Sequence, residues 1–291
     1  MLVNLLASGL ANGSVYALVA LGLIVIYRAT TVINFAHGEG FMLAGFLAWT
    51  LYVGLGLSYG AALVGAVAMA ALVGIATERL AFRPLIRGSV VNLVLATTGL
   101  AFLLRGVARY LWGGKGSDVP FPPVFTVQAV RVGDLVVSSQ HLIVLGGAVA
   151  TLLVFAALFR YTRLGRMMRA TAENQRAAAL VGIRVERISS LTWGVGVALA
   201  GVAAVLAAPL TLLYPDMGGP LLIRAFAAAL LGGLGSLGGA VVGGFSLGIV
   251  EQLTAGYIDS SLADVAPFLL IIVVLLLRPR GLFGSRVVVK M

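Results

Sequence analysis

The stretch FMLAGFLAWTLYVGLGLSYGAALVGAVAMAALVGIAT, from Phe41 to Thr77, contains no charged residue. A helix that crosses a membrane needs roughly 20 mostly apolar residues. This stretch is too long for one such helix, and it is interrupted near its middle by GLGLSYG, a sequence poor in helix formers. It therefore predicts two membrane-spanning helices joined by a short break.

The rest of the chain has the same apolar character. Of its 291 residues 60% are hydrophobic and only 10% are charged, and its mean hydropathy is +1.08. A soluble domain is typically about 45–50% apolar and about 25% charged. So few charged residues cannot cover a soluble surface, and we expect most of the chain to lie in lipid.

Further apolar segments of spanning length follow along the chain, and one glycine-rich segment is long enough for one tilted helix or two short ones. We expect an all-α, polytopic transmembrane bundle of about eight or nine spans, formed by residues 1–291 as a single transmembrane domain. The predicted spans are Leu5–Tyr27, two within Phe41–Thr77, Val90–Tyr110, Leu135–Phe159, Ile188–Leu213, Ala225–Val250 and Leu262–Leu277.

The basic residues predict the orientation, because short cytoplasmic loops retain Lys and Arg. Three segments hold most of them: residues 78–88, the loop 160–188 and the C-terminal tail. Placing these on one side puts the C-terminus in the cytoplasm and the N-terminus outside, which requires an odd number of crossings. The odd number favours two helices in the glycine-rich segment, or one re-entrant segment elsewhere in the chain. The residues concerned are Arg79, Arg83, Arg87, Arg160, Arg163, Arg166, Arg169, Arg176, Arg184, Arg187, Arg278, Arg280, Arg286 and Lys290, with Arg28 on the same side. On the outer side remain Lys115, Arg131 and Arg224.

The net charge of +10 is thus explained by topology, and we expect membrane lipid and no nucleic acid as a partner. The absence of cysteine excludes disulfides, thiol nucleophiles and cysteine-ligated metals. The external loop 112–134 contains Gly-Gly, Pro-Pro and alternating valines, which predict a turn and a small hairpin.

The cytoplasmic loop 160–188 contains one predicted helix, Met167–Val181, which we expect Gly182 to end. A short amphipathic helix on this side has two interpretations. It lies on anionic lipid headgroups, or it docks a partner protein, with the small residues Ala177–Ala179 allowing close approach.

Four motifs then indicate a family: INFAHGE at 33–39, ENQRAAALVGI at 173–183, LLGGLGSLGGAVVGG at 230–244 and RPRGLFG at 278–284. Together, in this order, they resemble the branched-chain amino acid permeases of the ABC importers over nearly the whole chain. The 173–183 motif resembles the loop through which such permeases contact their ATPases. The resemblance implies coupling roles for Glu173, Asn174, Arg176, Ala177, Ala178, Gly182 and Ile183.

The resemblance also implies partners: a second permease, identical or different, two cytoplasmic ATPases, and a periplasmic or lipid-anchored substrate-binding protein. The location would be the cytoplasmic (inner) membrane of a bacterium or archaeon. No GxxxxGK[ST] sequence is present. We therefore expect no cofactor on this chain, with ATP and Mg held by the partner ATPases.

His37 and Glu39 raise the question of an enzyme. The sequence has no HExxH and only one other histidine, His141, so neither a metal site nor a hydrolase is indicated. Topology places the motif near the inner face, where Glu39 suits the N-terminal dipole of the next helix. Two roles stay open, a cytoplasmic-side cap or gate and direct substrate contact, for Asn34, Phe35, His37 and Glu39.

Other polar residues in apolar segments have structural and functional interpretations side by side. Asn92, Thr97 and Thr98 hydrogen-bond within the protein or face a polar pathway. Arg105 and Arg109 are expected to anchor their helix at the interface. Glu251 is expected at the interface, and whether it pairs with Arg224 stays open. The glycines between 232 and 248 are expected to pack helices closely or to line the pathway as a broken segment, and they include Gly232, Gly233, Gly235, Gly239 and Gly243.

The function expected from these features is a non-enzymatic permease subunit of an ATP-driven importer for branched-chain or related hydrophobic amino acids, working by alternating access. Permeases for urea or short-chain amides are the nearest alternative. An ion-coupled carrier or channel is a further class, but it requires carboxylates at mid-membrane, and the sequence places none there clearly.

Overall fold

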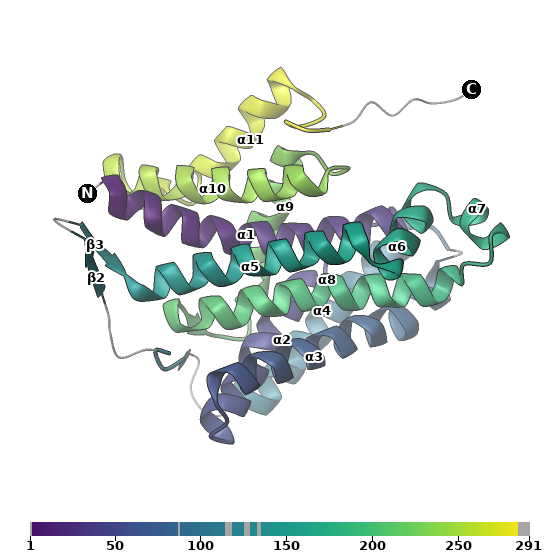
Figure 1. Cartoon of the computed structure of the whole chain (residues 1–291), viewed down its shortest axis with the longest axis horizontal. Coiled ribbons are helices and arrows are strands. Elements are labelled where there is room, and N and C mark those ends of the chain that lie inside the picture. Colours follow the sequence, from purple (N-terminus) through teal and green to yellow (C-terminus); the bar gives the residue numbers. More distant parts are fainter. Residues whose placement is uncertain (1, 87, 114–117, 125–128, 133–134, 285–291) are drawn as a thin grey trace.

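Most of the chain described by the computed structural model, residues 2–86, 88–113, 118–124, 129–132 and 135–284, is helical. Within these residues six helices are long and apolar enough to cross a membrane. The chain is thus a helical membrane bundle (Figure 1). Arg87, Lys115, Arg286 and Lys290 lie outside the described residues. The helices are α1 Leu2–Thr30, α2 His37–Trp49, α3 Tyr59–Thr77, α4 Val90–Trp112, α5 Ser139–Tyr161, α6 Arg163–Glu173, α7 Gln175–Leu180, α8 Val185–Ala207, α9 Gly218–Gly232, α10 Leu237–Tyr257 and α11 Ala266–Leu277.

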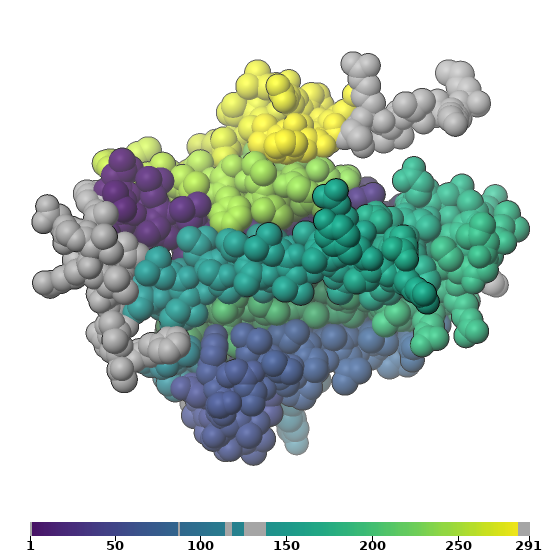
Figure 2. All heavy atoms as spheres, in the orientation of Figure 1, coloured from purple at the N-terminus to yellow at the C-terminus, as the bar shows by residue number. Residues whose placement is uncertain are grey.

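Helices α1 and α8 form the centre of the bundle. In the most apolar stretch of α1, 89% of the residues are buried, and in that of α8, 78% are. The corresponding share is 22% or less in α3, α4 and α5. A helix that is apolar on all sides is suited to such a position. On the face shown in Figure 2, α10 and α5 cover most of α1, and mainly its N-terminal end stays visible.

Glycine allows the central helices to approach at backbone distance. A side chain on Gly22 of α1 would collide with the carbonyl oxygen of Gly196 in α8. On the other side of α1, Gly9 and Gly13 lie against Gly248 and Gly244 of α10. Small residues let membrane helices pack this closely, and the contact area replaces the hydrophobic driving force that lipid cannot supply.

Two of the shorter helices begin inside the bundle. After α1 the chain runs back as a non-helical segment, residues 31–36, and α2 starts where the His37 ring meets the carbonyl of Val19, more than halfway along α1. After α8 the segment 211–217 returns in the same way, and α9 starts at Gly218, against Gly38. A long helix, a returning segment and a short helix therefore occur twice in the chain.

The two short helices run in opposite directions from this meeting point. Helix α2 continues into a π-helical turn, Thr50–Gly54, beside the end of α4. There the indole of Trp112, the last residue of α4, donates to Thr50 Oγ1 at 2.9 Å. Helix α9 runs the other way, to the turn before α10. Leu237, the first residue of α10, lies near Arg28 at the end of α1 and Phe159 near the end of α5. Opposed repeats with interrupted helices are common in transporters.

The basic segments come together at one end of the bundle, the α6–α7 end (Figure 1). Arg83 in the segment after α3 bonds the Glu78 carboxylate at 2.7 Å and the hydroxyl of Ser190 in α8 at 2.6 Å. The tail returns to the same end, where the Phe283 amide donates to the Gly232 carbonyl at 3.0 Å. The prediction that these segments share one side is thus confirmed for the residues described.

Short strands lie toward the opposite end, near the N-terminus. β2, Ala129–Val132, pairs antiparallel with β3, Leu135–Ser138. A hairpin is thus present, but only its first strand lies within the predicted loop 112–134, and its second strand follows that loop. β1, Val119–Pro120, pairs with β4, Leu212–Leu213, which ties this loop to the returning segment after α8.

Several predicted helix boundaries need correction. The span predicted at Leu135–Phe159 begins only at Ser139, because residues 135–138 pair as β3. The glycine-rich segment forms two helices, α9 and α10, which confirms the two-helix alternative; only its start differs, since α9 begins at Gly218, before the predicted limit. The last span is the 12-residue helix α11. The predicted helix Met167–Val181 is α6 and α7, separated at Asn174, whose extended backbone interrupts it and whose Oδ1 accepts from the amide of Ala177.

Candidate functional site

The first turn of α2 lies deep in the bundle, where four helices meet. His37 is completely buried, and its Nε2 lies 3.2 Å from the carbonyl of Val19 in α1. Gly38 and Gly218 touch backbone to backbone, so a side chain on either one would collide with the other. The starts of α2 and α9 are therefore in direct contact.

Glu39 is paired across this meeting point with Arg105 of α4. Arg105 Nε donates to Glu39 Oε1 at 2.8 Å, and Nη2 lies 2.6 Å from the same oxygen. The Glu39 side chain is 1% exposed and that of Arg105 is 24% exposed. The expectation that Arg105 is an interfacial anchor is wrong, because a buried carboxylate holds it.

The position expected for the motif at the inner face is also wrong. Glu39 does lie in the first turn of α2, but that turn lies against the middle of α1, and the returning segment 31–36 carries it there. The sequence argument that no carboxylate lies deep in the membrane therefore fails for Glu39. An intramembrane charge with a named partner is a candidate functional residue.

A second ion pair continues the first along α4. One turn beyond Arg105, Arg109 Nη2 contacts both carboxylate oxygens of Asp216 at 2.7 and 2.6 Å. Asp216 lies two residues before α9. Helix α4 is thus tied to the start of α2 by Arg105 and to the start of α9 by Arg109, and the second pair is half-exposed.

Asn34 and Phe35 have separate places near this centre. Asn34 is buried, and its Oδ1 accepts from the amide of Ala36 at 3.0 Å, so it shapes the turn into α2. Phe35 is 40% exposed. Asn34 thus bonds within its own turn, whereas His37 bonds a distant helix and leaves its Nδ1 without a partner among the described residues.

The uncharged polar residues of α4 that the sequence singled out, Asn92, Thr97 and Thr98, do not join the site. The hydroxyls of Thr97 and Thr98 both donate to the carbonyl of Val94 in their own helix, at 3.0 and 2.9 Å. Asn92 is exposed on the outside of the bundle near the start of α4. Of the two roles considered for Thr97 and Thr98, the structure therefore shows hydrogen bonding within the protein.

The glycines of the rich segment have distinct contacts. Gly239 and Gly243 of α10 lie against the backbone of Gly232 and Ala228 in α9. Gly233 has a left-handed φ of 99° and packs against the tail at Arg280. Gly235 lies in the exposed turn between the helices, so its expected place in a helix-packing row is wrong.

A cavity of about 190 Å³ lies beside the starts of α2 and α9. Its wall is mostly apolar and comes from α1, α2, the end of α8, the returning segment 211–217 and α9. Polar groups line it from three elements. They are Asn12 and Tyr16 of α1, Thr211 and Tyr214 of the returning segment, and Arg224 of α9. Sequence reasoning missed this site, although Arg224 in an apolar segment was the available signal.

Arg224 belongs to a partly buried polar cluster at the cavity wall. Its Nε lies 3.4 Å from Glu251 Oε1, and its Nη2 pairs with Asp264. Tyr16 donates to Glu251 Oε2 at 2.8 Å. The pairing of Arg224 with Glu251 that the sequence left open is present, and Glu251 is buried in protein, 8% exposed.

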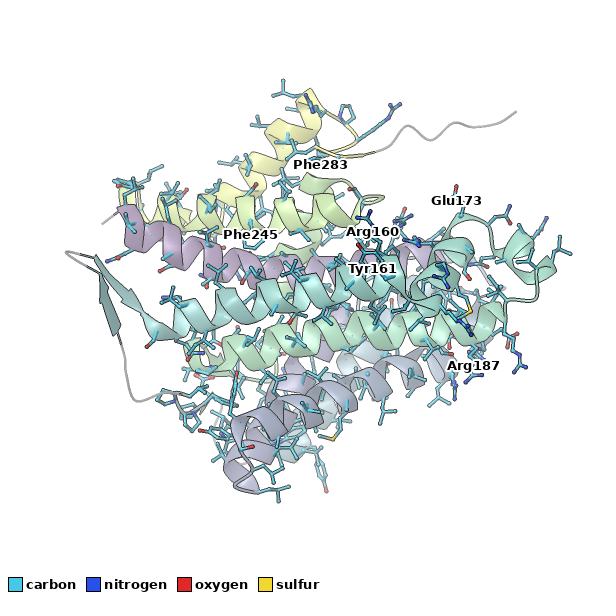
Figure 3. All side chains as sticks on the ribbon, viewed as in Figure 1. Arg160, Tyr161, Glu173, Arg187, Phe245 and Phe283 are labelled. Carbon is cyan, nitrogen blue, oxygen red and sulfur yellow. The ribbon has the colours of Figure 1, made fainter. Side chains whose placement is uncertain are left out.

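The segment 173–183 projects from the α6–α7 end of the bundle. Glu173 points away from the helices (Figure 3). Leu180 and Val181 are 89% and 76% exposed, while Ala178 is buried and Gln175 donates to the carbonyl of Ala29 at 2.7 Å. Gly182 ends α7 with a φ of 85°, and the Ile183 amide donates to the Ala178 carbonyl. Arg176 and Ala177 are exposed on α7.

Within the described residues no three His, Cys, Asp or Glu side chains are grouped to hold a metal. The buried carboxylates Glu39 and Glu251 instead form ion pairs with arginines of other helices. This arrangement can hold helices in register, and the cavity can hold a small ligand.

The chain belongs to the family described as "Branched-chain amino acid transport system / permease component", whose model matches residues 5–275. It is therefore a multi-pass membrane permease. Among known proteins it is 35% identical to the high-affinity branched-chain amino acid transport system permease protein LivH of Escherichia coli strain K12, over 97% of this chain and 96% of that protein. It is also 35% identical to the corresponding protein BraD of Pseudomonas aeruginosa, over 98% and 96%.

A solved structure shares the fold. PsaBC from Streptococcus pneumoniae in complex with Fab superposes with a TM-score of 0.52 at 15% sequence identity, covering 94% of this chain and 91% of that chain. At this identity the likeness concerns the arrangement of helices alone.

Proposed function

We propose that this chain is a membrane-spanning permease subunit of an ATP-driven ABC importer for branched-chain amino acids. The observation that carries the proposal is the family match from residue 5 to 275, together with relatives of that printed function at 35% identity over nearly the whole chain. Urea, short-chain amides and ion-coupled transport have no comparable support.

The proposed topology has nine crossings in the cytoplasmic (inner) membrane, with the N-terminus outside and the C-terminus inside. Helices α2 and α9 each complete a crossing together with the returning segment before them. The basic segments at the α6–α7 end support a cytoplasmic location of that end, because short basic loops stay inside.

The proposed assembly contains a second permease, two cytoplasmic ATPases and a substrate-binding protein on the outer side. The α6–α7 end is the docking site for an ATPase. Exposed Leu180 and Val181 supply apolar contact, and the surrounding arginines supply charge. ATP and Mg are bound by the ATPases, and this chain catalyses no reaction.

The proposed mechanism is alternating access. ATP-driven closure of the ATPases moves α6 and α7. Gln175 connects α7 to the end of α1, and α1 carries the His37 contact at its middle. Motion at the docking end can thus reach the junction of α2 and α9, where the cavity lies.

Co-purification tests the assembly. The tagged chain, purified in mild detergent from membranes of its native cells, is expected to bring down an ATPase in about equal amount to the permease pair. Recovery of the folded chain without any ATPase under several extraction conditions would refute the importer.

A further inference from the structure

The cavity at the junction combines an apolar wall with one cationic group. Val15 of α1, Phe41 of α2 and Leu221 of α9 face it. Arg224 lines the same cavity, one turn beyond Leu221 on α9. A ligand with an aliphatic part and a carboxylate matches both features, because apolar surface gains from burial and a guanidinium binds carboxylates well.

Arg224 retains capacity for a ligand. Its Nε lies 3.4 Å from Glu251 Oε1, and its Nη2 donates to Asp264. Within the described part of the chain, its Nη1 makes no hydrogen bond. Glu251 itself is occupied on both oxygens, by Arg224 and by the Tyr16 hydroxyl. The cluster therefore holds the guanidinium in place and leaves one of its nitrogens for another partner.

The position of the cavity also fits an anionic group. Helix α9 begins beside it, at the end of the returning segment that contributes Thr211, Tyr214 and Met217 to the wall. The N-terminus of a helix carries partial positive charge. In transporters, interrupted helices of this kind surround the substrate and direct their N-termini at its anionic groups.

Other ligand classes fit less well. A metal ion would need several oxygen or nitrogen ligands, but Arg224 is a cation facing the cavity. A purely apolar molecule would leave the guanidinium nitrogen unpaired.

We propose that this cavity is a binding site for the zwitterion of an aliphatic amino acid during its passage through the permease. Arg224 Nη1 receives the carboxylate, Asn12 and Thr211 offer oxygen acceptors to the ammonium group, and Val15, Phe41 and Leu221 contact the side chain. The site rests on the proposed function and names where the substrate is held within this chain.

Cysteine protection tests the site directly, because the chain contains no cysteine. Leu212 lines the cavity and is 49% exposed, so Leu212→Cys gives a reporter at its mouth. Leu57→Cys is the matched control, since Leu57 is 41% exposed in the connection between α2 and α3 and does not line the cavity. Each variant is reconstituted in liposomes as the complete importer and treated with a maleimide.

The proposal predicts that leucine slows labelling at Leu212→Cys, roughly tenfold at ten times its half-protecting concentration, and leaves Leu57→Cys unaffected. Leucinamide, which lacks the carboxylate, and 4-methylpentanoate, which lacks the ammonium group, should each protect only at much higher concentration. Arg224→Gln should abolish the preference for leucine over leucinamide, and Arg224→Lys should restore part of it. Tyr214→Cys provides a second reporter if Leu212→Cys does not assemble.

The outcomes separate this proposal from the proposed function. If the reporter variants import leucine with ATP but are labelled equally fast with and without leucine, the site is wrong and the function stands. If the importer containing the unsubstituted chain takes up no branched-chain amino acid, the function is wrong and the site falls with it.

Discussion

Glu39 and Arg105, 66 positions apart in the sequence, form an ion pair at the junction of the two interrupted helices, with Arg105 Nη2 2.6 Å from Glu39 Oε1. The pair joins α2 to α4 beside the backbone contact between Gly38 and Gly218. It therefore holds the start of α2 against α4, next to the point where α2 and α9 touch.

Removing one partner of this pair should be costly. Arg105→Gln leaves the nearly fully buried Glu39 without its cation, and a broken buried pair typically costs about 3–5 kcal/mol. Glu39→Gln should cost less, because the Arg105 side chain is 24% exposed and can find water. Unfolding of the purified protein in detergent measures both, and the double variant should lose less than the sum of the single ones.

Arg109→Gln is the matched control for this prediction. Its pair with Asp216 is half-exposed, with side chains 59% and 50% accessible, and exposed pairs contribute about 0–1 kcal/mol. Equal losses for Arg105→Gln and Arg109→Gln would show that the buried pair has no special role in stability.

The contact between Gly38 and Gly218 should tolerate no side chain. Gly38→Ala and Gly218→Ala each place a methyl group against the backbone of the other helix, and overpacking typically costs about 1–3 kcal/mol. Gly99→Ala in α4 is the control, because open space surrounds it, and its melting temperature should stay the same or rise. Unchanged melting of both Gly38 and Gly218 variants would contradict the close approach of α2 and α9.

The exposed apolar residues at the C-terminal end of α7, Leu180 and Val181, should carry ATPase docking. Leu180→Asp with Val181→Asp places charges where we expect an apolar contact, and ATPase recovery should fall at least about tenfold, equivalent to about 1.4 kcal/mol. Tyr161→Asp is the control, since Tyr161 is 71% exposed at the same end but belongs to α5 (Figure 3). Equal recovery with both variants would place the docking surface elsewhere.

Gly182 should be needed for the same docking geometry. Its φ of 85° lies in the left-handed region, which proline cannot adopt. Gly182→Pro together with Glu173→Arg should therefore abolish ATPase association while membrane insertion, measured by the amount of protein in the membrane fraction, stays normal. Association at the original level would count against the role of the segment 173–183.

The sequence predicted the membrane class, the break in Phe41–Thr77 and the shared side of the basic segments, because these follow from hydropathy and charge. It misplaced Glu39, since an apolar run looks the same whether its helix starts at the surface or halfway through. The partner of Glu39 was present as an opposite charge in another apolar segment, but only the fold brings Arg105 beside it.

Other features depended on contacts that spacing does not encode. The helical pattern from Met167 to Val181 continued through Asn174, and the break there comes from its extended backbone and its cap on α7. The cavity draws its wall from segments far apart in the chain, of which only Arg224 stood out as a lone charge.

The central claim is that this chain conducts branched-chain amino acids in an importer driven by ATP. The direct measurement is uptake of radiolabelled leucine by liposomes that contain the permease pair and its ATPases, with the binding protein outside and ATP within. We predict uptake that requires hydrolysable ATP and that excess isoleucine or valine abolishes. Leucine uptake that proceeds equally without ATP, or uptake of urea or amides in place of leucine, would contradict the account.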